Sequence, residues 1–131
     1  MKRNHPVPPR PTQAELEILR VLWQRGPSSV REVQQTLSET RLMGYTTVLK
    51  LLQIMARKRL VARDERERTH VYRAALAQEQ TQLQLVTDLL ERAFDGSASQ
   101  LILQALAARR ASPDEMDEIR KVLDKAQRRS S

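Results

Sequence analysis

Cysteine is absent from the 131 residues, histidine occurs only twice, and aromatic residues make up 3% of the chain. The lack of cysteine excludes disulfides, thiol catalysis and thiolate metal sites, and two histidines are too few for a histidine metal cage. Surfaces that bind single-stranded nucleic acid stack bases on aromatic rings, so the aromatic content argues against one. We therefore expect no metal and no cofactor.

Long apolar runs are also missing. No segment approaches the roughly 18 apolar residues of a membrane span, and the N-terminal MKRNHPVPPRP lacks the apolar core of a signal peptide. These features predict a cytoplasmic protein with no membrane insertion.

Catalytic motifs are scarce as well. The three glycines lie far apart in the sequence, so no glycine-rich phosphate loop exists. Acidic residues cluster at 114–118, but they occupy the predicted first turn of a helix, where carboxylates are favoured by the helix dipole. His70 has no indicated serine or aspartate partner and is interpreted as a polar strand residue. We expect no enzymatic activity.

Positive charge is plentiful and is concentrated in the first part of the chain, which has a formal net charge of +7 as a whole. Residues 1–76 hold 15 basic and 7 acidic side chains, whereas residues 77–131 hold 8 and 9. This asymmetry favours a polyanion-binding region followed by a neutral module. A basic surface that only confers solubility would give the same totals.

Capping residues and apolar spacing predict three short helices after a flexible, proline-rich basic arm at 1–11. Thr12 with Glu15, and Ser29 with Glu32, have the spacing of capping boxes at the start of the first two helices. The predicted helices run from 13 to 25, from 30 to near 39, and from 45 to the basic run at 57–59.

The hydrophobic period then changes from helical to alternating. Residues 60–63 and 70–73 alternate as strands do, and the charged run 64–69 between them predicts a β-hairpin with a charged tip. Three compact helices followed by a hairpin predict a winged helix-turn-helix domain over 12–76.

Three further helical segments carry apolar stripes over 77–131, which predicts a mostly α-helical protein with a C-terminal helical dimerisation domain. Segments of this length cannot bury so much apolar surface among themselves, and a second copy of the chain is the preferred cover, with docking on the basic domain as the alternative. The expected dimer-interface residues are Leu83, Val86, Leu90, Phe94, Leu101, Leu106, Ile119 and Leu123.

A helix-turn-helix places the N-terminal part of its second helix in the DNA major groove, where side chains meet base edges. Phosphate contacts come from the start of the preceding helix and from the wing. The residues expected to contact bases or their flanking phosphates are Tyr45, Thr46, Thr47 and Lys50, and those expected to contact phosphates are Ser29, Arg31, Arg66 and Arg68.

Alternatives remain open for several of these residues. Tyr45 is equally suited to pack as a hydrophobic staple onto Leu49, and either wing arginine could be a solvated charge paired with Glu65 or Glu67. The alternative function is a protein-interaction module, which an apolar exposed face on the third helix would favour. The polar residues on the exposed face of the third helix favour DNA as the partner, while Ile54 favours a protein.

Several segments resemble the penicillinase-repressor family (BlaI/MecI/CopY). They are ELEILRVLW at 15–23, SVREV at 29–33, YTTVL at 45–49 and, in the wing, RTHVY at 68–72. The resemblance covers about 12–125. It implies a winged-helix repressor that dimerises through C-terminal helices on palindromic double-stranded DNA of the TACA/TGTA type and controls β-lactamase or other cell-envelope or stress genes.

The sequence departs from the family pattern at three points. Arg59 stands where members often have glycine at the end of the third helix, which predicts a slightly strained turn. The cysteine motif of copper-responsive members is absent, so copper sensing is excluded. In penicillin-responsive members a sensor metalloprotease cuts the C-terminal domain, and the resemblance places the matching bond near Gln104-Ala105, without the family's Asn-Phe pair.

Overall fold

The computed structural model describes residues 10–66 and 68–130, so most of the predicted basic arm lies outside the described residues. The chain divides into two compact units, the first extending to Leu85 and the second beginning at Val86. The division falls inside one helix, α4 (Gln78–Ala93).

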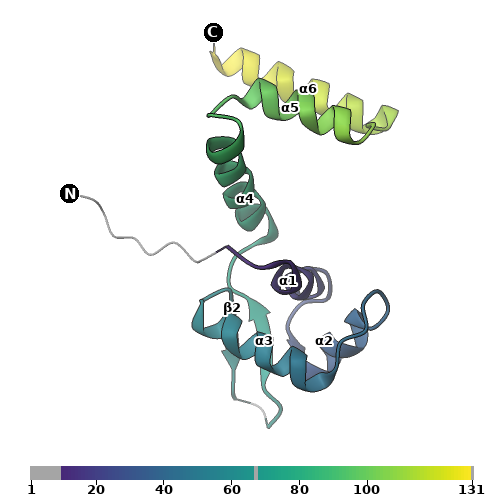
Figure 1. The fold of residues 1–131 in the computed structure, drawn as a ribbon, viewed down its shortest axis with the longest axis vertical. Helices are drawn as coiled ribbons and strands as arrows, with labels where there is room; N and C mark the ends of the chain where they lie inside the picture. The colour runs from purple at the N-terminus through teal and green to yellow at the C-terminus, as the bar shows by residue number, and fades with distance from the viewer. Residues whose placement is uncertain (1–9, 67, 131) are drawn as a thin grey trace, which may run out of the picture. The chain divides into compact units, whose positions relative to one another are not determined.

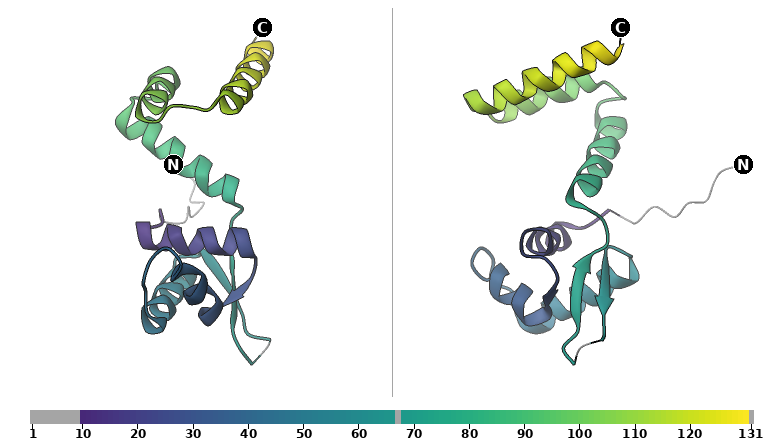
Figure 2. Two further views of the ribbon diagram at one scale, coloured as in Figure 1. Left: turned by 90° about the vertical axis from the view of Figure 1, so that its right-hand side faces the viewer. Right: turned by 180° about the vertical axis from the view of Figure 1, so that it is seen from behind.

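The first unit contains three helices and three short strands. In chain order they are α1 (Gln13–Arg25), β1 (Ser28–Ser29), α2 (Val30–Leu37), α3 (Tyr45–Arg57), β2 (Val61–Asp64) and β3 (Val71–Ala74). Figure 1 shows the helices gathered beside the hairpin strands, and in both views of Figure 2 the hairpin extends past the helices.

Both predicted capping boxes are present. The Thr12 hydroxyl accepts a hydrogen bond from the Glu15 amide at 3.2 Å, and the Thr12 amide donates to Glu15 Oε1 at 2.9 Å. Ser29 and Glu32 form the same reciprocal pair at the start of α2. These bonds satisfy backbone donors that have no partner inside the helix, which is why both helices begin where the sequence predicts.

The helices of the first unit share one hydrophobic core with the sheet. Each helix buries a single stripe at helical spacing, and the sheet contributes inward-facing residues from two strands. The most deeply buried members are Ile18, Leu19, Val33, Val48, Leu52, Met55 and Tyr72. This arrangement leaves the opposite face of each helix to solvent.

The sheet has one strand more than the sequence predicts. Its order is β1-β3-β2, with both neighbours antiparallel, and Ser28 pairs with Tyr72. The hairpin strands begin one residue later than predicted. The second helix ends at Leu37 rather than near 39, because the amides of Thr40 and Arg41 both donate to the Leu37 carbonyl and form a turn there.

Arg59 adopts a left-handed backbone conformation at the end of α3, with φ of 66°. The Leu60 amide donates to the Met55 carbonyl at 2.9 Å, and the Arg59 amide donates to the Ala56 carbonyl at 3.1 Å, which together form a Schellman motif. A side chain in this conformation costs about 1–2 kcal/mol. The strained turn predicted at this position is therefore confirmed.

A partly buried ion pair joins the start of α1 to the end of α3. Lys58 Nζ lies 2.7 Å from Glu15 Oε1, and the Glu15 side chain is only 3% exposed. Burial acts to raise the pKa of Glu15, but the hydrogen bonds from Lys58 and Thr12 outweigh it, so the pKa lies below the ordinary value of 4.5. The carboxylate is therefore charged at neutral pH.

The second unit consists of the rest of α4, α5 (Ala98–Ala108) and α6 (Pro113–Ser130). Both α5 and α6 begin with a side-chain cap, since Ser97 accepts from the Gln100 amide and Ser112 forms a reciprocal pair with Glu115. Helices α5 and α6 overlap in Figure 1 but are well separated in the left view of Figure 2. Among the described residues of these two helices, none is buried.

We predict that Glu15→Gln lowers the free energy of unfolding by about 1.5–3 kcal/mol, the range for a hydrogen bond to a charged group. Glutamine still serves the capping box, so the loss reports the pairing with Lys58. Urea unfolding at neutral pH measures it. The matched control is Glu17→Gln, which removes a more exposed pair with Arg41 and should cost less.

The effect of Glu15→Gln should also depend on pH. Because the pKa of Glu15 is lower in the folded chain than in the unfolded chain, its charge stabilises the fold above pH 4.5, and this contribution is lost as pH falls through the folded-state pKa. The difference between the two proteins should therefore shrink on acidification. A difference that stays constant down to the acid end of the titration would contradict the ion pair.

Candidate nucleic-acid interface

The solvent-facing side of α3 is polar along its first two turns. Thr46, Thr47 and Lys50 are exposed, whereas Val48 and Leu52 of the same helix are fully buried. The helical period of 3.6 residues separates the two sets. Ile54, whose orientation bears on a protein-binding alternative, is half-buried. The exposed face of α3 is thus not apolar.

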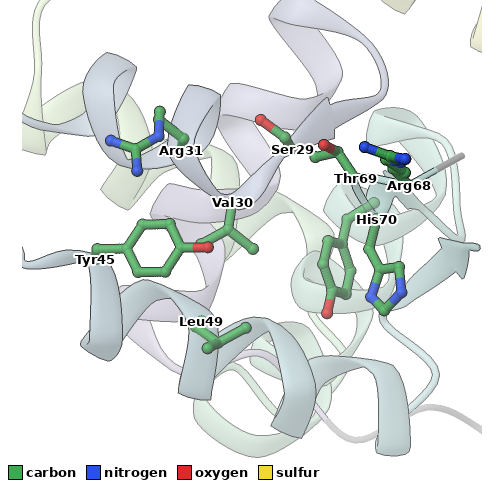
Figure 3. A pocket seen from close by; sticks show the side chains of 9 residues that line it. Ser29, Val30, Arg31, Tyr45, Leu49, Arg68, Thr69 and His70 are labelled. Atoms are coloured by element: carbon green, nitrogen blue, oxygen red, sulfur yellow. The ribbon is translucent and has the colours of Figure 1, made fainter.

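A pocket of about 350 Å³ opens where the start of α2, the start of α3 and the wing meet. It is lined by Ser29, Val30, Arg31, Tyr45, Leu49, Arg68, Thr69, His70 and Tyr72. Figure 3 shows the side chains of Arg31 and Tyr45 on one side and those of Arg68, Thr69 and His70 on the other, with the apolar Val30 and Leu49 between them. Two guanidinium groups thus flank an open hollow.

Tyr45 supports the first of these two guanidinium groups. The central carbon of the Arg31 guanidinium lies 5.4 Å from the centroid of the Tyr45 ring, which is within the range of a cation–π interaction. Leu49, which the sequence offered as a staple partner for Tyr45, lines the same pocket. The Tyr45 side chain remains 44% exposed.

The wing arginines differ in their surroundings. Arg66 pairs with Asp64, neither of the two glutamates considered from the sequence, and Glu65 pairs instead with Arg63. Glu67 lies outside the described residues. The hydrogen bonds from the Arg66 side chain and amide lower the pKa of Asp64 to about 2, so this carboxylate is ionised at neutral pH. Arg68 is exposed at the pocket.

The pocket brings together four of the eight expected DNA-contact residues, Ser29, Arg31, Tyr45 and Arg68. Thr46, Thr47 and Lys50 lie on α3 but do not line it, and neither does Arg66. The other five lining residues were not among the expected contacts: Val30, Leu49, Thr69, His70 and Tyr72. Residues two apart in a strand project from the same face. The alternation of the predicted strand could therefore have placed His70 and Tyr72 on one face.

Within residues 10–66 and 68–130, no group of three His, Asp or Glu side chains is placed to hold a metal ion. No helix in this part of the chain is long and apolar enough to cross a membrane.

Comparison with known proteins identifies relatives over most of the chain. A transcriptional regulator BlaI of Mycobacterium tuberculosis is 34% identical over 110 residues, 83% of this chain and 79% of its own length. The penicillinase repressor of Bacillus licheniformis is 23% identical over 92% of this chain and 94% of its own length. A solved complex structure of hsRosR-S4, 17% identical, covers 92% of both chains with a TM-score of 0.51, which supports the fold.

The three helices, the hairpin and the third strand make the first unit a winged helix-turn-helix, as the sequence predicts. The model of the penicillinase repressor family matches residues 11–125. This chain belongs to that family.

Proposed function

We propose that the chain is a transcriptional repressor that binds double-stranded DNA in the cytoplasm as a homodimer on a dyad operator. The observation that carries the proposal is the shared location of the polar face of α3 and the arginine-flanked pocket at its N-terminal end. Family membership supports it, since the relatives are a transcriptional regulator and a penicillinase repressor.

The recognition step follows from the geometry of α3. With its first two turns in the major groove, Thr47 and Lys50 reach base edges: the threonine methyl suits thymine, and the lysine ammonium suits guanine O6 and N7. Arg31 and Arg68 hold backbone phosphates on the two sides of the pocket, with the first kept in place by the Tyr45 ring. Phosphate contacts supply affinity, and α3 supplies the choice of sequence.

Dimerisation rests on the apolar side chains that α4, α5 and α6 leave in contact with solvent. Leu103 is 60% exposed and Val122 is 62% exposed in the single chain. The residues expected at the interface include exposed members, Leu83, Val86 and Leu123 among them. Covering this surface with a second copy removes it from water and provides the two recognition helices that a dyad operator requires, about 34 Å apart.

Release from DNA is proposed to follow cleavage by a sensor metalloprotease near Gln104-Ala105. Both residues lie inside α5 and are exposed in the single chain. A protease binds extended backbone, so α5 must unwind locally before it is cut. Cleavage there separates α6 from the DNA-binding unit and removes the advantage of two linked half-site contacts.

The first prediction from the proposed function separates sequence choice from affinity. On a duplex selected by the protein from a random pool, Thr47→Ala or Lys50→Ala should weaken binding by roughly 1–3 kcal/mol, with a smaller effect on a shuffled duplex. Arg68→Ala should weaken both duplexes alike and flatten the salt slope by about 0.9 per lost phosphate contact. Fluorescence anisotropy titrations measure both. Equal losses on the two duplexes for the α3 variants would refute the reading face.

The second prediction concerns the dimer. Leu103→Glu places a charge on the exposed apolar stripe of α5 and should give a monomer at concentrations where the unmodified chain is dimeric, as measured by light scattering. Gln104→Glu adds the same charge at the next position, about 100° around the helix, and serves as the control. A Leu103→Glu chain that remains dimeric would refute the interface, as would a monomeric unmodified chain.

The third prediction tests proteolytic release. In its own cells treated with cell-wall antibiotics, an immunoblot should show a fragment ending near residue 104, and untreated cells should show only the full-length chain. An intact chain during induction of the repressed genes would exclude cleavage as the signal.

A further inference from the structure

Asp64 and Arg66 form a closed pair at the base of the wing loop. Arg66 Nη2 lies 2.7 Å from Asp64 Oδ2, and Arg66 Nε lies 3.1 and 3.2 Å from the two carboxylate oxygens. The backbone amide of Arg66 also donates to Oδ1 at 3.0 Å. One carboxylate therefore holds both the side chain and the amide of a residue two positions further along the chain.

The two side chains of the pair differ in their exposure to solvent. The Arg66 side chain is 88% exposed, whereas that of Asp64 is 35% exposed. A guanidinium group has five N–H donors in a planar fork, and the carboxylate uses only the edge formed by Nε and Nη2. The remaining donors are available to a phosphate. Arg66 can therefore still form short-range hydrogen bonds, although its charge is balanced by its neighbour.

The neutral net charge of the Asp64–Arg66 pair weakens its long-range attraction to DNA. A basic side chain gains affinity by releasing counterions from the phosphate it neutralises. A guanidinium already paired with a carboxylate brings no net charge to the duplex. Its contribution then depends on direct hydrogen bonds, which require the wing to be docked in one position.

We infer that Asp64 is a specificity-determining residue, which withholds the charge of Arg66 from DNA that is not docked on α3. The inference rests on the proposed DNA-binding function. On an operator, the contacts of α3 fix the wing against one phosphate, and the outer donors of Arg66 bond to it. On other sequences binding is mainly electrostatic, and the neutral pair contributes little.

The test uses Asp64→Asn in the full chain. Asparagine keeps an oxygen that can accept from the Arg66 amide, so the local turn is retained while the charge is lost. Anisotropy titrations over a salt series compare a duplex selected from a random pool with a shuffled duplex of equal length. On the shuffled duplex, the plot of log K against log salt should steepen by about 0.9 per protomer. When salt is lowered from 1 M to 0.15 M, the binding constant of the variant should therefore rise roughly fivefold more than that of the unmodified chain. The gain on the selected duplex should be smaller.

Three further variants test whether the charge of Asp64 acts through Arg66. Asp64→Glu keeps the charge and should keep the original slope. Asp117→Asn removes one acidic charge from a similar pair with Arg120 on α6 and should leave the slope unchanged. In the Arg66→Ala background, Asp64→Asn should have no further effect, because Asp64 acts through Arg66.

An unchanged slope for Asp64→Asn would overturn the inference, as would a gain that persists without Arg66. Equal weakening on both duplexes would also overturn it, because Asp64 would then only orient Arg66. These results leave the proposed function intact so long as the unmodified chain prefers the selected duplex. Failure of the unmodified chain to select any sequence would refute the proposed function itself.

Discussion

One carboxylate oxygen, Oε1 of Glu15, fixes the helix that carries the exposed polar face. It accepts from the Thr12 amide and from Lys58 Nζ, and so it ties the first turn of α1 to the residue that ends α3. The chain reverses immediately afterwards through the left-handed Arg59 and enters β2. The position of the wing beside α3 therefore depends on a contact made outside the candidate interface.

The second constraint is the size of the core. A unit of this length buries only one stripe of each helix, so the burial of Val48, Leu52 and Met55 fixes the rotation of α3 about its axis. Thr47 and Lys50 face solvent as a consequence. The charges of the wing are arranged differently, since two of its arginines are balanced by Asp64 and Glu65. The exposed positive charge at the pocket is therefore concentrated at Arg31 and Arg68.

Features with local causes could be predicted from the sequence, and features with distant partners could not. The capping box of Ser29 and the strained turn at Arg59 depend on neighbouring residues, and both are confirmed. Strand β1 has only two residues and exists because Ser28 and Ser29 meet β3 more than forty positions later. The hydrogen bond from Trp23 to the Leu76 carbonyl likewise joins residues far apart in the sequence. The pairing of Arg66 with Asp64 is local, but Asp64, Glu65 and Glu67 all lie within two positions of Arg66, and spacing alone does not choose among them. The polar face of α3 followed from periodicity, whereas its role in DNA binding remains a proposal.

The two units differ in how they remove their apolar surface from water. The first closes a core of its own, while α5 and α6 have no buried residue within the described part of a single chain. In the proposed homodimer, the apolar stripe that includes Leu103 is covered only on association, so the stability of these helices and the affinity for a dyad operator are linked by mass action. Any event that opens α5 must therefore weaken association and operator binding together. A repressor built in this way needs no ligand pocket in the winged unit, because its release from DNA can be controlled entirely by whether the second unit stays intact.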